Sequence, residues 1–236
     1  MKYILAFFIL LMSNLAITQN TYKLSGGVEA PLLYAGAMSM GISIPINKKV
    51  EPLTKFQINE LDPLSISKFD RVSTKTFGLG AQKLSDKFLY SSPVLPLTLL
   101  LDGNSSKEFG TISTMYFETM LVNYGITELT KVLIKRTRPF VYNKNADHNL
   151  KMKRNARKSF FSGHTSTVAA STFFTAKVLS DMNPGGNNNA YWITAAAIPA
   201  LTAYLRVRGG KHFPTDVLIG YTVGALIGIL VPELHK

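Results

Sequence analysis

The chain has 236 residues, no cysteine and a formal net charge of +12 at pH 7. Without cysteine it has no disulfide bonds, thiolate metal ligands or cysteine nucleophiles. The excess of Lys and Arg points to an anionic partner, and the sequence shows neither the aromatic interleaving nor the binding helix of a nucleic-acid module. We therefore expect one domain that binds a membrane surface or a phosphorylated substrate, and no nucleic-acid partner.

The first 19 residues have the pattern of a secretory signal peptide. Lys2 precedes an apolar run from Tyr3 to Met12, and small or polar residues follow it. The alternative is an uncleaved anchor helix, although the run is shorter than the roughly 20 residues of a membrane span. We assign residues 1–19 to a signal peptide or anchor, residues 20–110 to an N-terminal helical region and residues 111–236 to a core that carries the chemistry.

Six apolar segments follow the leader and predict helices. They are Pro31–Ile46, Phe88–Leu101, Thr111–Ile134, Thr165–Leu179, Ala190–Leu205 and Val217–Val231. Their small residues favour close helix packing in a bilayer. Against this, most are shorter than roughly 20 residues, and the mean hydropathy is only +0.13. The sequence predicts an all-α bundle of about six helices embedded in a membrane, with a soluble helical bundle as the alternative.

The connecting segments are more polar. Asn47–Lys87 has irregularly spaced apolar residues and predicts one or two amphipathic helices that cap the bundle or lie on a membrane surface. Pro93 and Pro96 interrupt the second apolar segment, so we expect it to enter a membrane only partway. Asp181–Asn189 is dominated by Pro, Gly and Asn and predicts an exposed turn between two helices.

The first of three motifs lies at the end of the third apolar segment. Lys131 and Arg138 are seven residues apart, which is two helical turns, so both cations lie on one face. They could hold the non-bridging oxygens of a phosphate ester, Arg138 in a bidentate manner. For Lys135 and Arg136 we prefer the simpler interpretation of basic residues that the helix dipole favours near a C-terminus.

The second motif is Ser162-Gly163-His164, just before a predicted helix. Ser162 suits an N-cap position, and the free amides of the first turn form an anion site. Gly163 lets the backbone approach a ligand closely. His164 would then lie beside a bound phosphate and could donate a proton to the leaving oxygen.

The third motif combines Arg206, His212 and Asp216, with a helix predicted to begin near Pro214. The Asp216 carboxylate could accept a hydrogen bond from one ring nitrogen of His212 and leave the other nitrogen nucleophilic. A metal site at His212 and Asp216 is the weaker alternative, because the nearby cations would repel a metal ion.

Other ionisable residues lie outside the motifs. We expect His148 and His235 to be solvated bystanders, and spacing assigns no partner to Glu128 or Asp181.

Together the motifs resemble those of the type 2 phosphatidic acid phosphatase and vanadium-dependent haloperoxidase superfamily. That family has Lys, six residues and Arg-Pro, then Pro-Ser-Gly-His, then Ser-Arg, five residues, His, three residues and Asp. Phe161 stands where the family usually has Pro, and Leu205 where it usually has Ser; we expect both departures to tune the site. Nine positions match in type, order and spacing: Lys131, Arg138, Pro139, Ser162, Gly163, His164, Arg206, His212 and Asp216.

The resemblance implies His212 as nucleophile, Asp216 as its orienting carboxylate and His164 as general acid. It implies a second group of residues as phosphate ligands: Lys131, Arg138, Ser162, Gly163 and Arg206. No metal or other cofactor is expected for a phosphatase, and residues 20–110 are expected to carry substrate selection.

We therefore expect a phosphatase that hydrolyses a phosphate monoester or pyrophosphate, of a lipid, through a phosphohistidine. A vanadium-dependent haloperoxidase, in which the same cations hold vanadate, and a catalytically silent protein that binds anionic lipids are the alternatives. We place the chain in the inner membrane of a bacterial envelope with its site facing the periplasm. If all six segments crossed after a cleaved leader, the site would instead face the cytoplasm.

Overall fold

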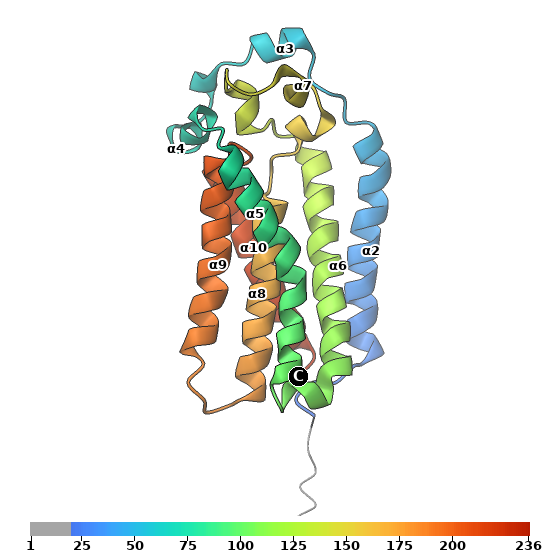
Figure 1. Cartoon of the computed structure of the whole chain (residues 1–236). Helices are drawn as coiled ribbons and strands as arrows, with labels where there is room; N and C mark the ends of the chain where they lie inside the picture. The colour runs from blue at the N-terminus through green and yellow to red at the C-terminus, as the bar shows by residue number, and fades with distance from the viewer. Residues whose placement is uncertain (1–19) are drawn as a thin grey trace, which may run out of the picture.

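Six long helical runs lie side by side in the computed structural model, which describes residues 20–236 (Figure 1). All regular secondary structure in this range is helical, which confirms the predicted all-α class. The predicted leader, residues 1–19, lies outside the described residues. The long runs are α2 (Gly26–Lys48), α5 (Leu79–Ser91) continued by the 3-10 helix η3 (Ser92–Leu101), α6 (Phe109–Ile134), α8 (Gly163–Met182), α9 (Asn189–Arg208) and α10 (Pro214–Leu234).

The helices are longer than the apolar segments that predict them. α2, α6, α8, α9 and α10 have 23, 26, 20, 20 and 21 residues, because additional residues at one or both ends extend each apolar run. By length and composition alone, α10 is the one helix in the described range that is apolar enough to cross a membrane.

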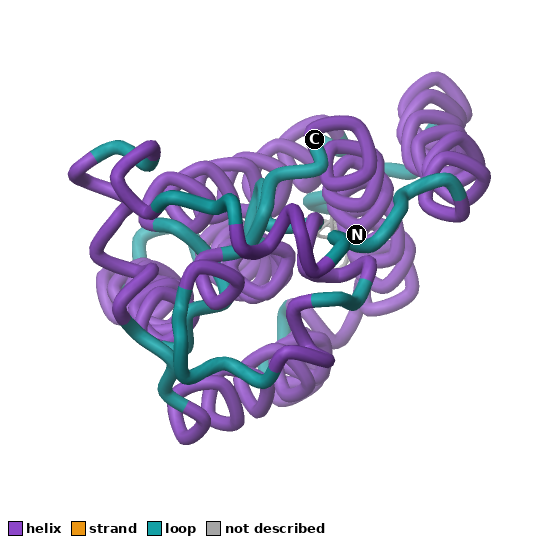
Figure 2. The backbone as a smooth tube through the Cα atoms, turned by 90° about the horizontal axis from the view of Figure 1, so that it is seen from above, coloured by secondary structure: helices purple, strands orange, loops and turns teal. Residues whose placement is uncertain are grey.

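Short helices cap one end of the bundle. They are α3 (Lys55–Asn59), η1 (Pro63–Ser65), α4 (Lys68–Arg71), η2 (Val72–Lys75), η5 (Pro139–Tyr142), α7 (His148–Lys151) and η6 (Arg154–Arg157). Seen along the bundle, the cap crosses over the ends of the long helices (Figure 2). This confirms that the polar stretch after α2 caps the bundle, although it forms several short helices where one or two amphipathic ones were predicted. At the opposite end, η4 (Ser105–Glu108) leads into α6, and the predicted turn joins α8 to α9.

The two prolines of the second apolar segment do not divert the chain. Pro93 and Pro96 lack an amide hydrogen, so the α-helical pattern of α5 gives way to the 3-10 pattern of η3. The chain continues along the bundle to its far end (Figure 1). How deeply this segment enters a membrane stays a prediction.

Helix α8 is the central helix of the bundle, in contact with α6, α9, α10 and η3. Most of its residues are buried, and they are small: Ser166, Ala169, Ala170 and Ser171 are fully enclosed. Small side chains let four neighbours approach one helix from different sides.

Glycines on α10 allow its close approach to α8. A Cβ at Gly220, Gly224 or Gly228 would collide with the backbone carbonyl of Ser162, Ser166 or Ala170, respectively. The Ser162 amide also donates to the backbone carbonyl of Asp216 over 3.0 Å. The first turns of α8 and α10, which carry the second and third motifs, are therefore fixed side by side.

The prediction that His235 is solvated is wrong. Its side chain is fully buried after the end of α10, where Nδ1 donates to the Val231 carbonyl over 2.8 Å and Nε2 lies 3.2 Å from Glu118 Oε2. The C-terminus folds back against α6 and α2, a contact between distant parts of the chain that sequence spacing does not reveal. His148, at the start of α7, is exposed as predicted.

Replacing a helix glycine by alanine should have opposite effects at two positions. Gly224→Ala should lower the free energy of unfolding by about 1–3 kcal/mol, because its methyl group meets the α8 backbone. Gly41→Ala, in α2 with no atom within 4 Å of the new methyl group, should raise it by about 0.5–1 kcal/mol. Thermal unfolding of both purified variants under identical conditions checks this, and equal stabilisation by both would contradict the packing.

Candidate active site

The three motifs meet at the capped end of the bundle. α6 and α9 end there, and α8 and α10 begin there (Figure 1). Every residue predicted for the site reaches this end: Lys131, Arg138, Ser162, Gly163, His164, Arg206, His212 and Asp216.

His212 is buried just before α10 with both ring nitrogens engaged. Nδ1 lies 2.7 Å from the Ser159 carbonyl oxygen, and Nε2 lies 3.0 Å from Nη1 of Arg138. A carbonyl only accepts and a guanidinium only donates, so the proton is on Nδ1 and Nε2 carries the lone pair. Burial and the nearby cations Arg138 and Arg206 lower the pKa of His212 well below its usual value. The residue is therefore a neutral imidazole with a nucleophilic Nε2.

The predicted hydrogen bond between His212 and Asp216 does not form. Nδ1 of His212 lies 3.7 Å from Oδ2 of Asp216, which instead accepts from the Ser159 hydroxyl and, over 2.9 Å, from the Phe213 amide. An acidic residue in the first turn of a helix turns back to the free amide at the helix start, and Asp216 does so here. Asp216 therefore acts on His212 through Ser159, whose hydroxyl donates to Asp216 and whose carbonyl accepts from His212.

Arg136 is more than a basic residue at a helix end, so its simple interpretation was wrong. Its guanidinium donates to Asp216 Oδ1 and, over 2.8 Å, to Asp70 Oδ2 in α4. Asp70 also accepts from the Thr215 amide over 2.9 Å. This buried ion-pair network ties the cap to the first turn of α10 and fixes Asp216. Lys135 ends α6 in a left-handed backbone conformation, φ 51°.

Arg138 is a buried cation that backbone and amide oxygens hold in place. Nε donates to the Asn155 carbonyl over 2.8 Å, Nη2 to Asn155 Oδ1 over 3.1 Å and Nη1 to the Lys211 carbonyl over 2.9 Å. Burial lowers its pKa to about 10, which leaves it protonated at neutral pH. Its charge is therefore fixed next to Nε2 of His212. Sequence reasoning missed Asn155, which lies in the basic loop without a recognisable motif.

The start of α8 has the geometry that the sequence predicts for an anion site. Ser162 is the N-cap, and its Oγ accepts from the Thr165 amide over 3.3 Å. Amides of the first helical turn have no intrahelical partner, so they can bind an anion. A Cβ at Gly163 would lie 2.8 Å from Nζ of Lys131, so the glycine lets this ammonium group lie against the helix start.

Glu128 restrains two cations at the site. Its carboxylate accepts from Lys131 Nζ over 2.7 Å and from Lys158 Nζ over 3.1 Å, and Lys158 also donates to Asn47 Oδ1 over 3.2 Å. Spacing had assigned Glu128 no partner, although Lys131 follows it at the i+3 position. Lys158 is thus a further cation near the motif residues.

Arg206 and His164 share a partner that sequence reasoning missed. Asp86 Oδ1, on α5, lies 2.7 Å from His164 Nε2 and 3.2 Å from Arg206 Nη1. Ser85 Oγ accepts from the same Nη1 over 3.1 Å, which provides polar support where Leu205 replaces the family's serine. The buried Nε of Arg206 has no hydrogen-bond partner within the described range, as suits a ligand for an incoming anion. Nothing in the sequence links α5 to residues about 80 and 120 positions away.

Positive charge dominates the site. Lys211, beside His212, has its pKa lowered to about 8 by burial and by the nearby cations Arg138 and Arg206. A phosphate group would relieve this repulsion. Across residues 20–236, no cluster of three or more His, Asp or Glu side chains is arranged to hold a metal ion.

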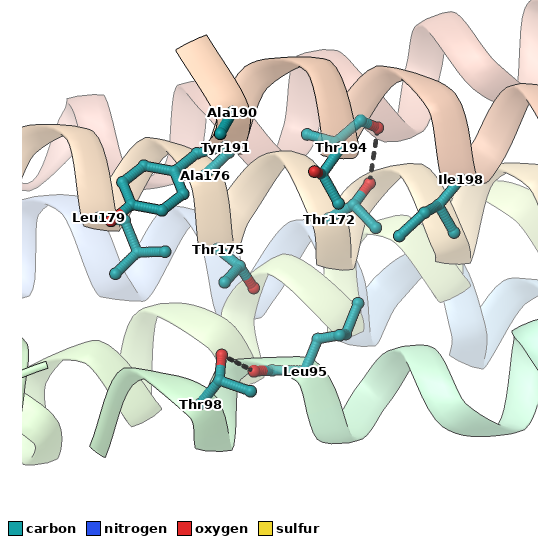
Figure 3. A pocket seen from close by; sticks show the side chains of 11 residues that line it. Leu95, Thr98, Thr172, Thr175, Ala176, Leu179, Ala190, Tyr191, Thr194 and Ile198 are labelled. Carbon is teal, nitrogen blue, oxygen red and sulfur yellow. Dashed lines mark hydrogen bonds between the residues drawn. The ribbon is translucent and has the colours of Figure 1, made fainter. Parts of the chain in front are cut away.

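An apolar cavity of about 380 Å³ lies between η3, α8 and α9 (Figure 3). Thr98, Thr172 and Thr175 line it, but their hydroxyls donate to backbone carbonyls and leave the wall mainly apolar. Its other lining residues are Leu95, Ala176, Leu179, Ala190, Tyr191, Thr194, Ala195 and Ile198.

Comparisons with known proteins found one curated relative and one solved structure to report. A lipid A 4'-phosphatase from Porphyromonas gingivalis is 30% identical over 82 residues, which are 35% of this chain and 32% of that protein. The chain thus matches about a third of the length of this relative. A crystal structure of a transmembrane PAP2-type phosphatidylglycerolphosphate phosphatase from Bacillus subtilis is similar over 85% of this chain and 96% of its own, with a TM-score of 0.48 and 20% sequence identity.

A family model described as the PAP2 superfamily matches residues 113–236, which is more than half of the chain and includes all three motifs. The chain therefore belongs to the PAP2 superfamily.

Proposed function

We propose that the chain is a phosphatase that hydrolyses a phosphate monoester or pyrophosphate of a lipid through a phosphohistidine on His212. The observation that carries the proposal is the neutral His212, whose Nε2 lone pair lies among fixed cations while Nδ1 is held by the Ser159 carbonyl. A buried, oriented and uncharged imidazole in a cationic site is suited to attack phosphorus.

In the first step, Nε2 of His212 forms a bond to phosphorus while the bond from phosphorus to the ester oxygen breaks. His164 donates a proton to that oxygen, so the alcohol leaves neutral. In the second step, water attacks phosphorus, the bond to nitrogen breaks, and His164 takes a proton from the water. Inorganic phosphate leaves, and both histidines return to their starting states.

The surrounding groups stabilise charge on the transferring phosphoryl group. Lys131, Arg138 and Arg206 supply cations, and the first turn of α8 supplies amides. All of them are already held by protein contacts, so little reorganisation accompanies the reaction. Arg138, which donates to Nε2 in this structure, can turn the same N–H onto a phosphoryl oxygen as the nucleophile engages.

The apolar cavity supports a lipid substrate. Three lining residues of the cavity lie eight or nine positions from site residues on the same helical runs. Leu95 follows Asp86 along α5 and η3, Thr172 follows His164 along α8, and Ile198 precedes Arg206 on α9. Eight helical residues span about 12 Å, so the cavity continues the seam between the three elements on which the site lies. A phosphate at the site would leave an attached apolar chain free to follow this seam. Similarity to a lipid A 4'-phosphatase is also in keeping with a phosphorylated lipid.

Exposed apolar side chains support a membrane location for the bundle. Large hydrophobic residues cover the outer faces of five of the six long runs, while the central α8 has none exposed. Such surface is costly in water and favourable in a bilayer. Representative residues are Met38, Leu97, Phe117, Leu201 and Leu230.

Removing the nucleophile should abolish turnover. His212→Ala should lower the rate of phosphate release by at least about 10³-fold, because no other group replaces the nucleophile. His148→Ala, in the exposed cap, should keep full activity. Binding of inorganic phosphate to His212→Ala reports whether the variant is folded.

Persistent turnover by a folded His212→Ala variant would overturn the mechanism. If the wild-type protein binds phosphorylated lipids but releases no phosphate, it is a silent lipid-binding protein. Halide oxidation that depends on added vanadate would instead identify a haloperoxidase.

Narrowing the cavity should affect lipid substrates selectively. Thr194→Phe puts a ring at the cavity wall and should lower kcat/KM for a long-chain lipid phosphate by about 10-fold, with p-nitrophenyl phosphate unaffected. Thr222→Phe makes the same change at an exposed α10 position away from the cavity and should change neither value. If Thr194→Phe lowered kcat/KM equally for both substrates, or for neither, the cavity would not be a binding site for the lipid chain.

We also propose that the site faces the periplasm across the bacterial inner membrane. The basic cap is a poor guide to orientation, because several of its cations belong to the site. α2 begins at the end of the bundle opposite the site (Figure 1), so this orientation puts the start of α2 on the cytoplasmic side. A cleaved leader directly before α2, one of the two alternatives for residues 1–19, would give the reverse orientation, so the proposed orientation requires that residues 1–19 are not removed as a signal peptide.

Two single-cysteine variants distinguish the orientations, since the chain has no cysteine of its own. Asn145, in the cap, and Asn187, in the turn between α8 and α9, are exposed at opposite ends. A membrane-impermeant maleimide should label Asn145→Cys in intact spheroplasts and label Asn187→Cys only after permeabilisation. The opposite pattern would place the site in the cytoplasm.

A further inference from the structure

We propose that Asp86 is a positioning residue of the active site, which orients His164 as the general acid, favours its protonated form and weakens the interaction of Arg206 with phosphate. The inference rests on the proposed phosphatase function and deepens it. Asp86 belongs to none of the three motifs and lies on α5, outside residues 113–236.

A single carboxylate oxygen links the two functional side chains. Asp86 Oδ1 lies 2.7 Å from His164 Nε2 and 3.2 Å from Arg206 Nη1. The Arg206 side chain is 5% exposed and the His164 side chain 22%, whereas Asp86 is 44% exposed. The carboxylate thus reaches from the solvent-facing side of α5 onto two side chains that α8 and α9 enclose.

His164 needs this carboxylate because its other charged neighbours are cations. Arg206 comes from α9, Arg138 from the segment after α6, and His164 is also close enough to His212 to influence it electrostatically. Lys131, from α6, lies against the neighbouring Gly163, and Lys211 lies beside His212. Glu128 is already shared by Lys131 and Lys158. Like charges disfavour an imidazolium, and Asp86 is the carboxylate in contact with it.

The hydrogen bond also determines which nitrogen delivers the proton. A carboxylate accepts, so Nε2 of His164 carries a hydrogen that Asp86 holds. The remaining proton of the imidazolium is then on Nδ1, and that is the proton available to the leaving oxygen. After transfer the neutral imidazole keeps its Nε2–H on Asp86, with Nδ1 ready to accept a proton from the attacking water.

The Asp86 carboxylate also competes with an incoming phosphate for the guanidinium of Arg206. While Nη1 donates to Asp86, part of the guanidinium charge is neutralised, and an incoming phosphate meets a weaker cation. Asp86 therefore should increase the rate of the chemical step and weaken the binding of phosphate. A purely structural ion pair that fastens α5 to α8 and α9 would have neither specific effect.

Asp86→Asn separates these possibilities when two soluble esters are compared. A short alkyl phosphate has a basic leaving group that requires protonation, whereas p-nitrophenyl phosphate releases a stable anion. At neutral pH, Asp86→Asn should lower kcat for the alkyl phosphate by about 10²-fold and leave p-nitrophenyl phosphate near its wild-type rate. His164→Ala should show the same pattern, and the double variant should be no slower than His164→Ala alone.

Two further readouts distinguish positioning from structure. Because His164 acts protonated and Asp86 favours that form, the high-pH limb of kcat for the alkyl phosphate should move to lower pH in Asp86→Asn. Inorganic phosphate should inhibit this variant at lower concentration than the wild type, because Arg206 is released. Asp86→Glu should restore part of the alkyl phosphate rate, and Asp147→Asn, an exposed carboxylate in the cap, serves as the neutral control.

Equal losses on both esters with an unchanged high-pH limb would overturn the assignment of Asp86. So would full alkyl phosphate activity in Asp86→Asn. If the wild-type protein hydrolyses neither ester nor any lipid phosphate, the proposed function itself fails, and this result is distinct from the other two.

Discussion

The structure depends on holding several cations at one end of a helical bundle with few carboxylates to offset them. Burying an ion is costly unless a partner or hydrogen bonds compensate. Lys131 has Glu128, Arg206 has Asp86 and Arg136 has Asp70, but Arg138 has only the oxygens of Asn155 and Lys211 and the lone pair of His212. Each cation is thus restrained while the site as a whole keeps net positive charge. Under the proposed function, a phosphate group would complete this arrangement and bind to charge that the fold has already ordered.

Close packing of α10 on α8 makes that order possible. With glycine at positions 220, 224 and 228, the α10 backbone lies directly against the carbonyls of α8, and the two helix starts are locked by the bond from the Ser162 amide to the Asp216 carbonyl. The same first turn directs the Asp216 carboxylate to the Phe213 amide and the Ser159 hydroxyl. Ser159 in turn orients the ring of His212. The position of His212 is therefore a consequence of helix packing, transmitted through Ser159.

Local patterns predict the long helices and the N-cap at Ser162, because periodicity and capping act within a few residues. The gathering of the three motifs is what the family resemblance implies. The site contacts that these local patterns do not predict are made between residues far apart in the sequence. Asp86 and Asp70 reach the site from α5 and α4, and Asn155 reaches it from an irregular loop. The expected hydrogen bond between His212 and Asp216 is absent for a related reason. The i to i+4 spacing predicts proximity, but the Asp216 carboxylate accepts from the free Phe213 amide at the start of α10 instead. His235, near the chain's end, is buried by α6 rather than solvated.

The division between an N-terminal region and a catalytic core stays a prediction, but the contacts give that region a second role. The family match begins at residue 113, after both Asp70 and Asp86. Asp70 holds Arg136 and through it Asp216, while Asp86 holds His164 and Arg206. Carboxylates from residues 20–110 therefore help to hold the motif residues in their observed geometry. η3, which continues α5, forms one wall of the apolar cavity, so the helical run that would meet the substrate's chain also carries Asp86, the partner of His164. Under the proposed function, substrate fit and proton transfer would thereby be linked through one helical run, α5 with its continuation η3.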